Sequence, residues 1–191
     1  MSRRVVALLV AGLLSLLTVL CVQPMAGAAT QSEPAIYYTT SMRSASIYEV
    51  RASYSWKCLD LRGGSNNPGT VVQTFDCKGR LHQRFWFMRS GTPGLFHMGA
   101  FAYCLGTQNA STAENTPIVL GHCQGPGQHF RWVDRGSNHW DIVEASSGKC
   151  LTDTGYRSAM QLRTCAPMQE PYPTLWTPLY AGQWDYSNPN G

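Results

Sequence analysis

Charged side chains are scarce in this chain of 191 residues, because Asp, Glu, Lys and Arg together make up only 14% of it. Soluble domains usually contain roughly a quarter of such residues. The 15 Lys and Arg residues are scattered and form no cluster, and the formal net charge is only +4. A basic patch is the usual mark of a nucleic-acid-binding protein, so its absence predicts that the protein has no nucleic-acid partner.

Helical patterns and the common catalytic motifs are also lacking. No pattern of Ala, Glu, Lys and Leu at helical spacing occurs anywhere after residue 30, which argues against long helices. No G-x-S-x-G, H-E-x-x-H or Gly-rich phosphate loop is present, although these motifs accompany many hydrolases and nucleotide-binding enzymes. The five His residues show no metal-ligand spacing. We therefore expect no enzyme activity, no cofactor and no metal site.

The first 28 residues have the organisation of a secretory signal peptide. Arg3 and Arg4 precede an apolar run from Val5 to Leu20, and small residues follow at Ala26-Gly27-Ala28. Basic, apolar and small-residue segments in this order predict cleavage near Ala28. The apolar run is short for a stable membrane span. We expect a secreted, extracellular protein with no membrane span after signal cleavage.

Six of the seven cysteines lie beyond this segment, and an even number in an exported chain favours disulfides. The separations within successive pairs are 19, 19 and 15 residues, which favours three local bridges. A zinc site is the alternative, but no C-x-x-C or paired-His spacing is present, as such a site would require. The predicted bridges are Cys58–Cys77, Cys104–Cys123 and Cys150–Cys165.

The same cysteines mark a threefold internal repeat. The leading cysteine of each pair recurs at intervals of 46 residues and is always followed by Leu, and an aromatic residue stands 26 or 27 positions later. Between these landmarks, short runs rich in β-branched residues, such as Val71–Phe75, alternate with turn clusters such as Gly63–Gly69. This alternation predicts an all-β fold. Three propeller blades would be too few to close, so we expect a closed barrel with a hairpin cap.

The repeated pattern of Cys-Leu, closing Cys and Q-x-W/F resembles the ricin-B-type β-trefoil lectins over residues 46–179. The triplets are Gln83-Arg84-Phe85, Gln128-His129-Phe130 and the divergent Thr174-Leu175-Trp176. The resemblance implies a β-trefoil of three pseudo-symmetric repeats, each carrying one local disulfide. It also implies that Phe85, Phe130 and Trp176 are core residues. Residues 29–45 then form an N-terminal arm, and residues 180–191 form a C-terminal tail.

The resemblance also implies a carbohydrate-binding site in the first repeat. In that family an Asp two residues after the leading Cys, a Gln four before the closing Cys and an aromatic residue two before it form the sugar pocket. Asp60, Gln73 and Phe75 match these positions. Gln83 stands where a supporting amide is expected, and His82 replaces the usual Asn.

The other two repeats depart from this pattern. In the second repeat Gly106, Val119 and Gly121 replace the Asp, the Gln and the aromatic residue, so we expect no sugar site there. In the third repeat Thr152 stands at the Asp position and Arg163 at the aromatic position. Asp153 and Gln161 remain as candidate sugar contacts there, with Tyr156 as a stacking face.

The resulting hypothesis is a secreted lectin module that binds galactose-type or related glycans, so glycans or glycoconjugates are the expected partners. A second hypothesis is a delivery subunit that resembles the ricin-like binding subunits of cytolethal distending toxins. In that case the aromatic residues in the two terminal segments of this chain would dock a secreted catalytic partner. A third is an enzyme or enzyme inhibitor built on the trefoil, since fold does not fix function. A glycosidase is disfavoured because residues 29–45 and 180–191 leave too little chain for a catalytic domain.

Overall fold

The computed structural model describes residues 33–40, 44–167 and 173–185, so the expected signal peptide over residues 1–28 lies outside the described residues. In the part described, no helix is long and apolar enough to cross a membrane. The structure consists of short strands with three single-turn 3-10 helices. The strands are β1 (Ser44–Ala52), β2 (Cys58–Leu61), β3 (Val72–Phe75), β4 (Phe85–Arg89), β5 (Phe96–Ala100), β6 (Tyr103–Thr107), β7 (Thr116–Gly121), β8 (Phe130–Asp134), β9 (Trp140–Glu144), β10 (Cys150–Thr152), β11 (Gln161–Arg163) and β12 (Leu175–Asp185).

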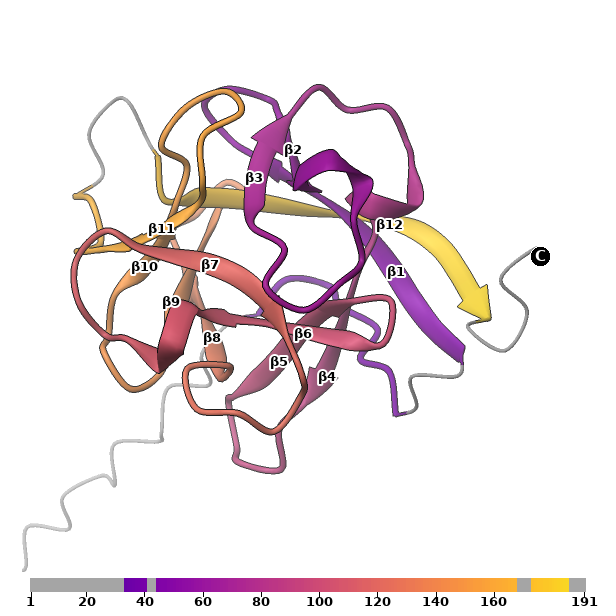
Figure 1. Ribbon diagram of the computed structural model, residues 1–191, viewed down its shortest axis with the longest axis horizontal. Coiled ribbons are helices and arrows are strands. Elements are labelled where there is room, and N and C mark those ends of the chain that lie inside the picture. The colour runs from indigo at the N-terminus through magenta and orange to yellow at the C-terminus, as the bar shows by residue number, and fades with distance from the viewer. Residues whose placement is uncertain (1–32, 41–43, 168–172, 186–191) are drawn as a thin grey trace, which may run out of the picture. The chain divides into compact units, whose positions relative to one another are not determined.

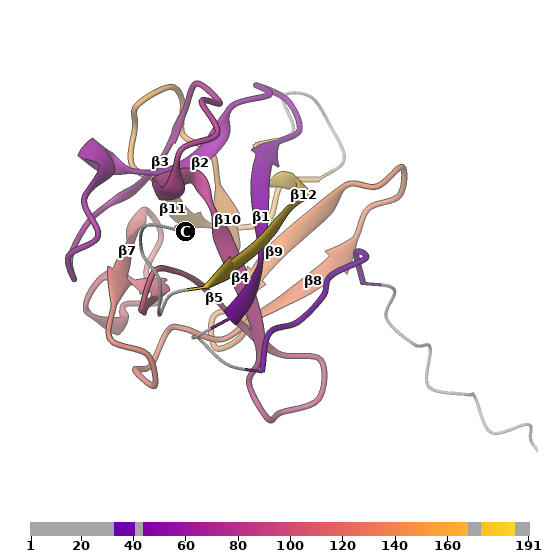
Figure 2. The ribbon, with the colours of Figure 1, turned by 90° about the vertical axis from the view of Figure 1, so that its right-hand side faces the viewer.

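Six of these strands close into a barrel. Strand β1 pairs with β4, β4 with β5, β5 with β8, β8 with β9, β9 with β12, and β12 returns to β1. All of these pairings are antiparallel. The β1–β12 ladder runs along one side of the barrel, where the two strands lie side by side in Figures 1 and 2. Closure leaves the barrel without an unpaired edge strand.

The remaining strands form three hairpins, β2–β3, β6–β7 and β10–β11. Each hairpin continues from a barrel strand through the pairs β1–β2, β5–β6 and β9–β10. The chain therefore consists of three four-strand repeats: repeat 1 is β1–β4, repeat 2 is β5–β8 and repeat 3 is β9–β12. A six-stranded barrel capped by three hairpins is a β-trefoil, and the fold predicted from the sequence is confirmed.

One disulfide closes each hairpin, as the cysteine spacing predicted. The bonds are Cys58–Cys77, Cys104–Cys123 and Cys150–Cys165. In every repeat the first cysteine lies in the strand that enters the hairpin, and the second follows the strand that leaves it. The bond therefore fixes the base of the hairpin against the barrel.

The core repeats the same threefold pattern. The predicted core aromatics Phe85, Phe130 and Trp176 are all completely buried. The Leu after each leading cysteine is buried as well, at Leu59, Leu105 and Leu151. Burying one such side chain contributes about 1.5–3 kcal/mol, so each repeat supplies an equivalent share of one common core.

The described part of the N-terminal arm packs against the barrel. The backbone N–H of Thr39 donates to the carbonyl of Phe87 in β4 over 2.8 Å. The ring of Tyr38 lies 6.3 Å from that of Phe96 in β5, and the guanidinium of Arg89 lies 3.8 Å from the centre of the Tyr38 ring. These contacts attach residues 33–40 to strands β4 and β5.

The strands extend past both domain boundaries expected from the sequence. Strand β1 begins at Ser44, and β12 continues to Asp185, with which Ser44 is paired. Residues 180–185, expected in a separate C-terminal tail, thus belong to the barrel. In an antiparallel pair, residues that precede one strand lie opposite residues that follow the other. The first residues of β1 and the last residues of β12 therefore lengthen the same ladder.

Candidate functional site

A surface pocket of about 480 Å³ lies on the β2–β3 hairpin of repeat 1. Four of the five residues predicted for the sugar site line this first-repeat pocket: Asp60, Gln73, Phe75 and His82. Asp60 and Gln73 lie opposite each other in the β2–β3 ladder, and His82 belongs to the 3-10 turn before β4. The fifth residue, Gln83, is completely buried and contacts Asp60.

The carboxylate of Asp60 is only 3% exposed and is held by two amides. Its Oδ1 accepts a hydrogen bond of 2.8 Å from Nε2 of Gln73, and its Oδ2 accepts one of 3.0 Å from Nε2 of Gln83. Nε2 of His82 lies 3.4 Å from Oδ2. A carboxylate offers about four lone-pair positions. The two amides therefore leave two positions for hydroxyl groups of a ligand, and the one on Oδ2 lies near the His82 imidazole.

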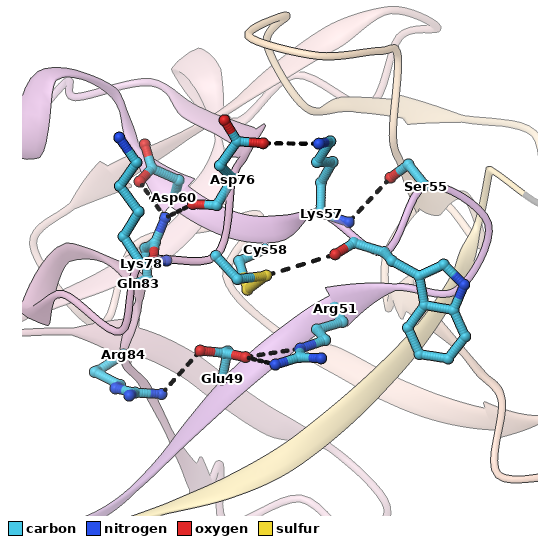
Figure 3. Close-up of a disulfide and its surroundings, with 12 residues drawn as sticks. Glu49, Arg51, Ser55, Lys57, Cys58, Asp60, Asp76, Lys78, Gln83 and Arg84 are labelled. Atoms are coloured by element: carbon cyan, nitrogen blue, oxygen red, sulfur yellow. Dashed lines mark hydrogen bonds and ion pairs between the residues drawn. A yellow bond between two sulfur atoms is a disulfide. The ribbon is translucent and has the colours of Figure 1, made fainter.

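Gln83 positions Asp60 and does not face the pocket. Its Nε2 also donates to the backbone carbonyl of Asp76 over 2.8 Å, and its Oε1 accepts from the backbone N–H of Lys78 over 2.7 Å (Figure 3). Both amide hydrogens are used, so none is left for a ligand. In repeat 2, Gln128 spans the corresponding loop by binding the backbone of His122 and Gly125. The Gln of the triplet thus ties the segment around the closing cysteine to the barrel.

The aromatic ring that lines the pocket, Phe75, packs against a ring from another repeat. The ring of Phe75 stacks on that of Tyr156, with centroids 5.3 Å apart and an angle of 21° between the planes. Tyr156 lies between β10 and β11, and the backbone there contacts β3 through a hydrogen bond of 2.9 Å from the N–H of Arg157 to the carbonyl of Thr74. The sequence suggested Tyr156 as a stacking face in repeat 3, whereas the structure places it beside the pocket of repeat 1.

Two arginines that the sequence analysis did not assign also line the first-repeat pocket, Arg62 and Arg157. Nε of Arg62 donates to Oε1 of Gln73 over 3.1 Å, and its Nη2 donates to the backbone carbonyl of Arg157 over 3.2 Å. Arg62 follows Asp60 by two positions, which was a usable signal. Arg157 gave none, because it approaches from another repeat.

The rim of the pocket depends on glycine. Gly63 and Gly64 both have a φ of +69°, in the left-handed region that residues with a side chain seldom adopt. A Cβ atom on Gly64 would lie 3.3 Å from Nδ1 of His82. The absence of a side chain therefore lets the rim pass close to the imidazole.

The Lys57–Asp76 ion pair holds the hydroxyl group of Tyr156. Nζ of Lys57 donates to Oδ1 of Asp76 over 2.7 Å, and the hydroxyl of Tyr156 donates to Oδ2 over 3.0 Å (Figure 3 shows the Lys57–Asp76 pair). The Lys57 ammonium and then the Tyr156 hydroxyl lower the pKa of Asp76 below its ordinary value. Asp76 is thus an anion whose charge is already paired.

Repeat 2 has no room for the same arrangement. Gly106 pairs with Val119 in the β6–β7 ladder, at the register position of Asp60 and Gln73. A Cβ atom on Gly106 would lie 2.7 Å from Cγ of Gln128, so the space of the carboxylate is filled. Repeat 2 therefore lacks a counterpart of the Asp60 carboxylate, and the absence of a sugar site there stays a prediction.

Replacing Gly106 by Asp is expected to destabilise the protein by about 1–3 kcal/mol, because the side chain must displace Gln128 in a packed interior. It should not create a second binding site. Chemical unfolding measures the first effect and glycan titration the second. Val119→Gln is the control, since it adds a polar side chain to the same hairpin at a half-exposed position. Equal stability of the wild type and Gly106→Asp would contradict the packing argument.

The candidates of repeat 3 are occupied by other contacts. Oδ1 of Asp153 accepts from the Thr74 hydroxyl over 2.8 Å and from the N–H of Gly155 over 2.9 Å, and its Oδ2 accepts from the Ser55 hydroxyl over 2.9 Å. Asp153 therefore joins repeat 3 to repeat 1. Oε1 of Gln161 accepts from the guanidinium of Arg163. Neither residue lines the first-repeat pocket, and the hypothesis of a sugar contact in repeat 3 finds no support in these bonds.

Two groups of potential metal ligands occur among the described residues, Glu49 with Cys58 and Cys77, and Asp141 with Cys150 and Cys165. In both, the cysteines are joined in disulfides and offer no thiolate. The carboxylates bind arginines instead, Glu49 at 2.6 Å from Arg51 and Asp141 at 2.6 Å from Arg135. The donor sets therefore do not suit a metal ion.

A trefoil with a carboxylate and an aromatic ring on one cap hairpin has the features of a carbohydrate-binding module. Residues 46–171 match the model of the ricin-type beta-trefoil lectin domain. The chain therefore belongs to this lectin family and is a carbohydrate-binding module, in agreement with the resemblance seen in its sequence. No curated protein matches the chain in a sequence comparison.

Several solved structures share the fold. The designed threefold symmetric protein ThreeFoil is 22% identical with a TM-score of 0.64, and the match covers 71% of this chain and 99% of that protein. SeviL bound to asialo-GM1 saccharide is 12% identical with a TM-score of 0.56, covering 72% and 98%. The Haemophilus ducreyi cytolethal distending toxin is 12% identical with a TM-score of 0.58, covering 76% and 88%. At these identities the similarity shows the fold alone.

Proposed function

We propose that the protein is a secreted lectin that binds galactose-type or related glycans in the first-repeat pocket. The observation that carries this proposal is the buried carboxylate of Asp60, which two amides hold beside the ring of Phe75. Gln73 lies opposite Asp60 and retains one amide hydrogen beyond the one that it donates to Asp60. The pocket therefore presents polar groups and an apolar ring face together.

Sugar chemistry matches both features. The two open lone-pair positions of Asp60 accept hydrogen bonds from neighbouring hydroxyl groups, and bonds to a charged acceptor are the stronger kind. Tyr156 stacks on one face of the Phe75 ring, so Phe75 packs against the C–H face of the sugar ring with its other face, as an aromatic side chain does with apolar surface. A single shallow site of this kind binds with a dissociation constant of about 0.1–1 mM. Useful avidity then requires a multivalent surface or several copies of the protein.

The experiment is a glycan array probed with the protein without residues 1–28, displayed multivalently. We expect binding to glycans that end in galactose or a related sugar. Gln161→Ala serves as the matched variant, because it removes one of the two repeat 3 candidates and leaves the first-repeat pocket intact. Its pattern should equal that of the wild type. An array on which the multivalent wild type binds nothing would refute the proposed function.

The delivery-subunit hypothesis keeps one supporting observation. Tyr37 of the N-terminal arm and Tyr180 of β12 are 67% and 52% exposed, and their ring centroids lie 5.6 Å apart. Both chain ends thus contribute to one exposed aromatic pair, as a docking surface for a catalytic partner would need. If the double variant Tyr37→Ala with Tyr180→Ala binds a co-secreted catalytic protein more weakly while its glycan binding is unchanged, this alternative gains support.

A further inference from the structure

The charged groups at the mouth of the first-repeat pocket are mainly positive. Asp60 is buried beneath the surface and already accepts hydrogen bonds from two amides. Arg62 and Arg157 also line the pocket, and both are exposed. A ligand that enters therefore meets two guanidinium groups before it reaches the single carboxylate.

Both guanidinium groups are held in place and retain free donors. A guanidinium has five N–H donors, and Arg62 uses two of its nitrogens, on Gln73 and on the backbone of Arg157. The Arg157 guanidinium lies 4.9 Å from the centre of the Phe75 ring and 5.4 Å from that of Tyr156. Within the described ranges, it makes no hydrogen bond or ion pair.

Neighbouring charges do not cancel this positive mouth. Asp76, which accepts from the Tyr156 hydroxyl, is paired with Lys57. Lys78 places a further ammonium 5.2 Å from the centre of the Phe75 ring. The Phe75 ring thus lies close to two cationic side chains, Lys78 and Arg157.

We propose that the preferred ligand is an acidic saccharide, in which a carboxylate or sulfate group binds Arg62 and Arg157 while ring hydroxyls bind Asp60. The planar fork of arginine matches the paired oxygens of both anions. Asp60 repels an anion placed next to it, so the acidic group lies at the arginine end and orients the sugar. This inference rests on the proposed function and specifies its ligand class.

The test compares galactose with galacturonate and with galactose 6-sulfate, which carry an anion on the same sugar ring. Calorimetric titration of the wild type at low salt should give roughly tenfold tighter binding of at least one acidic sugar, the usual scale of a charge-assisted contact. Raising the salt concentration to about 0.5 M should reduce this advantage, because exposed charges are screened. If only one of the two acids binds more tightly than galactose, its anionic group, carboxylate or sulfate, is the one that the pocket prefers.

Arg157→Gln should remove the advantage, so that this variant binds the acidic sugars no more tightly than it binds galactose, because the anion loses one of its guanidinium partners. Arg163→Gln is the matched control, because it removes one exposed positive charge in repeat 3, where Arg163 binds Gln161. Equal wild-type affinities for galactose and both acids, or equal behaviour of Arg157→Gln and Arg163→Gln, would overturn the inference. If the wild type binds none of these sugars, the result would instead overturn the proposed function.

Discussion

Replacing Asp60 by asparagine is expected to lower the affinity for glycans roughly 100-fold, to below detection for a single site. Asparagine has the same shape but carries no charge, and its amide hydrogens would face the amide donors of Gln73 or Gln83, which now bind the carboxylate. Two charge-assisted hydrogen bonds to sugar hydroxyls are lost together. Multivalent array binding and calorimetric titration with galactose measure the effect.

Asp153→Asn is the matched control for this variant. It removes another carboxylate that is held by hydrogen bonds, but one that lies outside the first-repeat pocket and contacts Ser55 and Thr74. Circular dichroism of both variants shows whether the fold is retained. If folded Asp60→Asn binds glycans as well as the wild type, the first-repeat pocket is not the site.

Removing the Cys58–Cys77 bridge by replacing both cysteines with serine should lower the free energy of unfolding by about 2–5 kcal/mol. The bond closes a loop of 19 residues in the sequence, and without it the unfolded chain gains conformational freedom. Cys58 is also completely buried in β2, so serine introduces a polar group into the interior. Guanidinium chloride unfolding with and without reductant measures the loss.

The Cys104–Cys123 bridge of repeat 2 provides the comparison, because it has the same sequence separation of 19 residues. Its removal should cost a similar free energy and spare the glycan affinity of the folded protein. The bridge of repeat 1, in contrast, lies next to the first-repeat pocket, because Cys58 precedes Asp60 by two residues. Cys77 lies between Asp76 and Lys78, and Gln83 binds the backbone of both of these residues. Unchanged stability in both double variants would contradict the role of the bridges.

Much of the fold and half of the site followed from the sequence, because both depend on local spacing. In an antiparallel hairpin, side chains two positions apart lie on the same face, so the Cys positions fix the register. Phe75 pairs with Cys58, and Gln73 pairs with Asp60. Counting from the cysteines therefore selected residues that the structure also places side by side, and the same counting identified Gly106 and Val119 as their counterparts in repeat 2.

Contacts between repeats were decided only by the tertiary structure. Tyr156 and Arg157 lie about 80 residues after Phe75 in the sequence, and they reach the first-repeat pocket because the segment before β11 pairs with β3. The same contact makes Asp153 a partner of Thr74 and Ser55. A repeat pattern assigns each residue to its own unit. It carries no information on which neighbouring unit a loop contacts. The orientation of the loop depends on the packing of side chains that differ between the repeats.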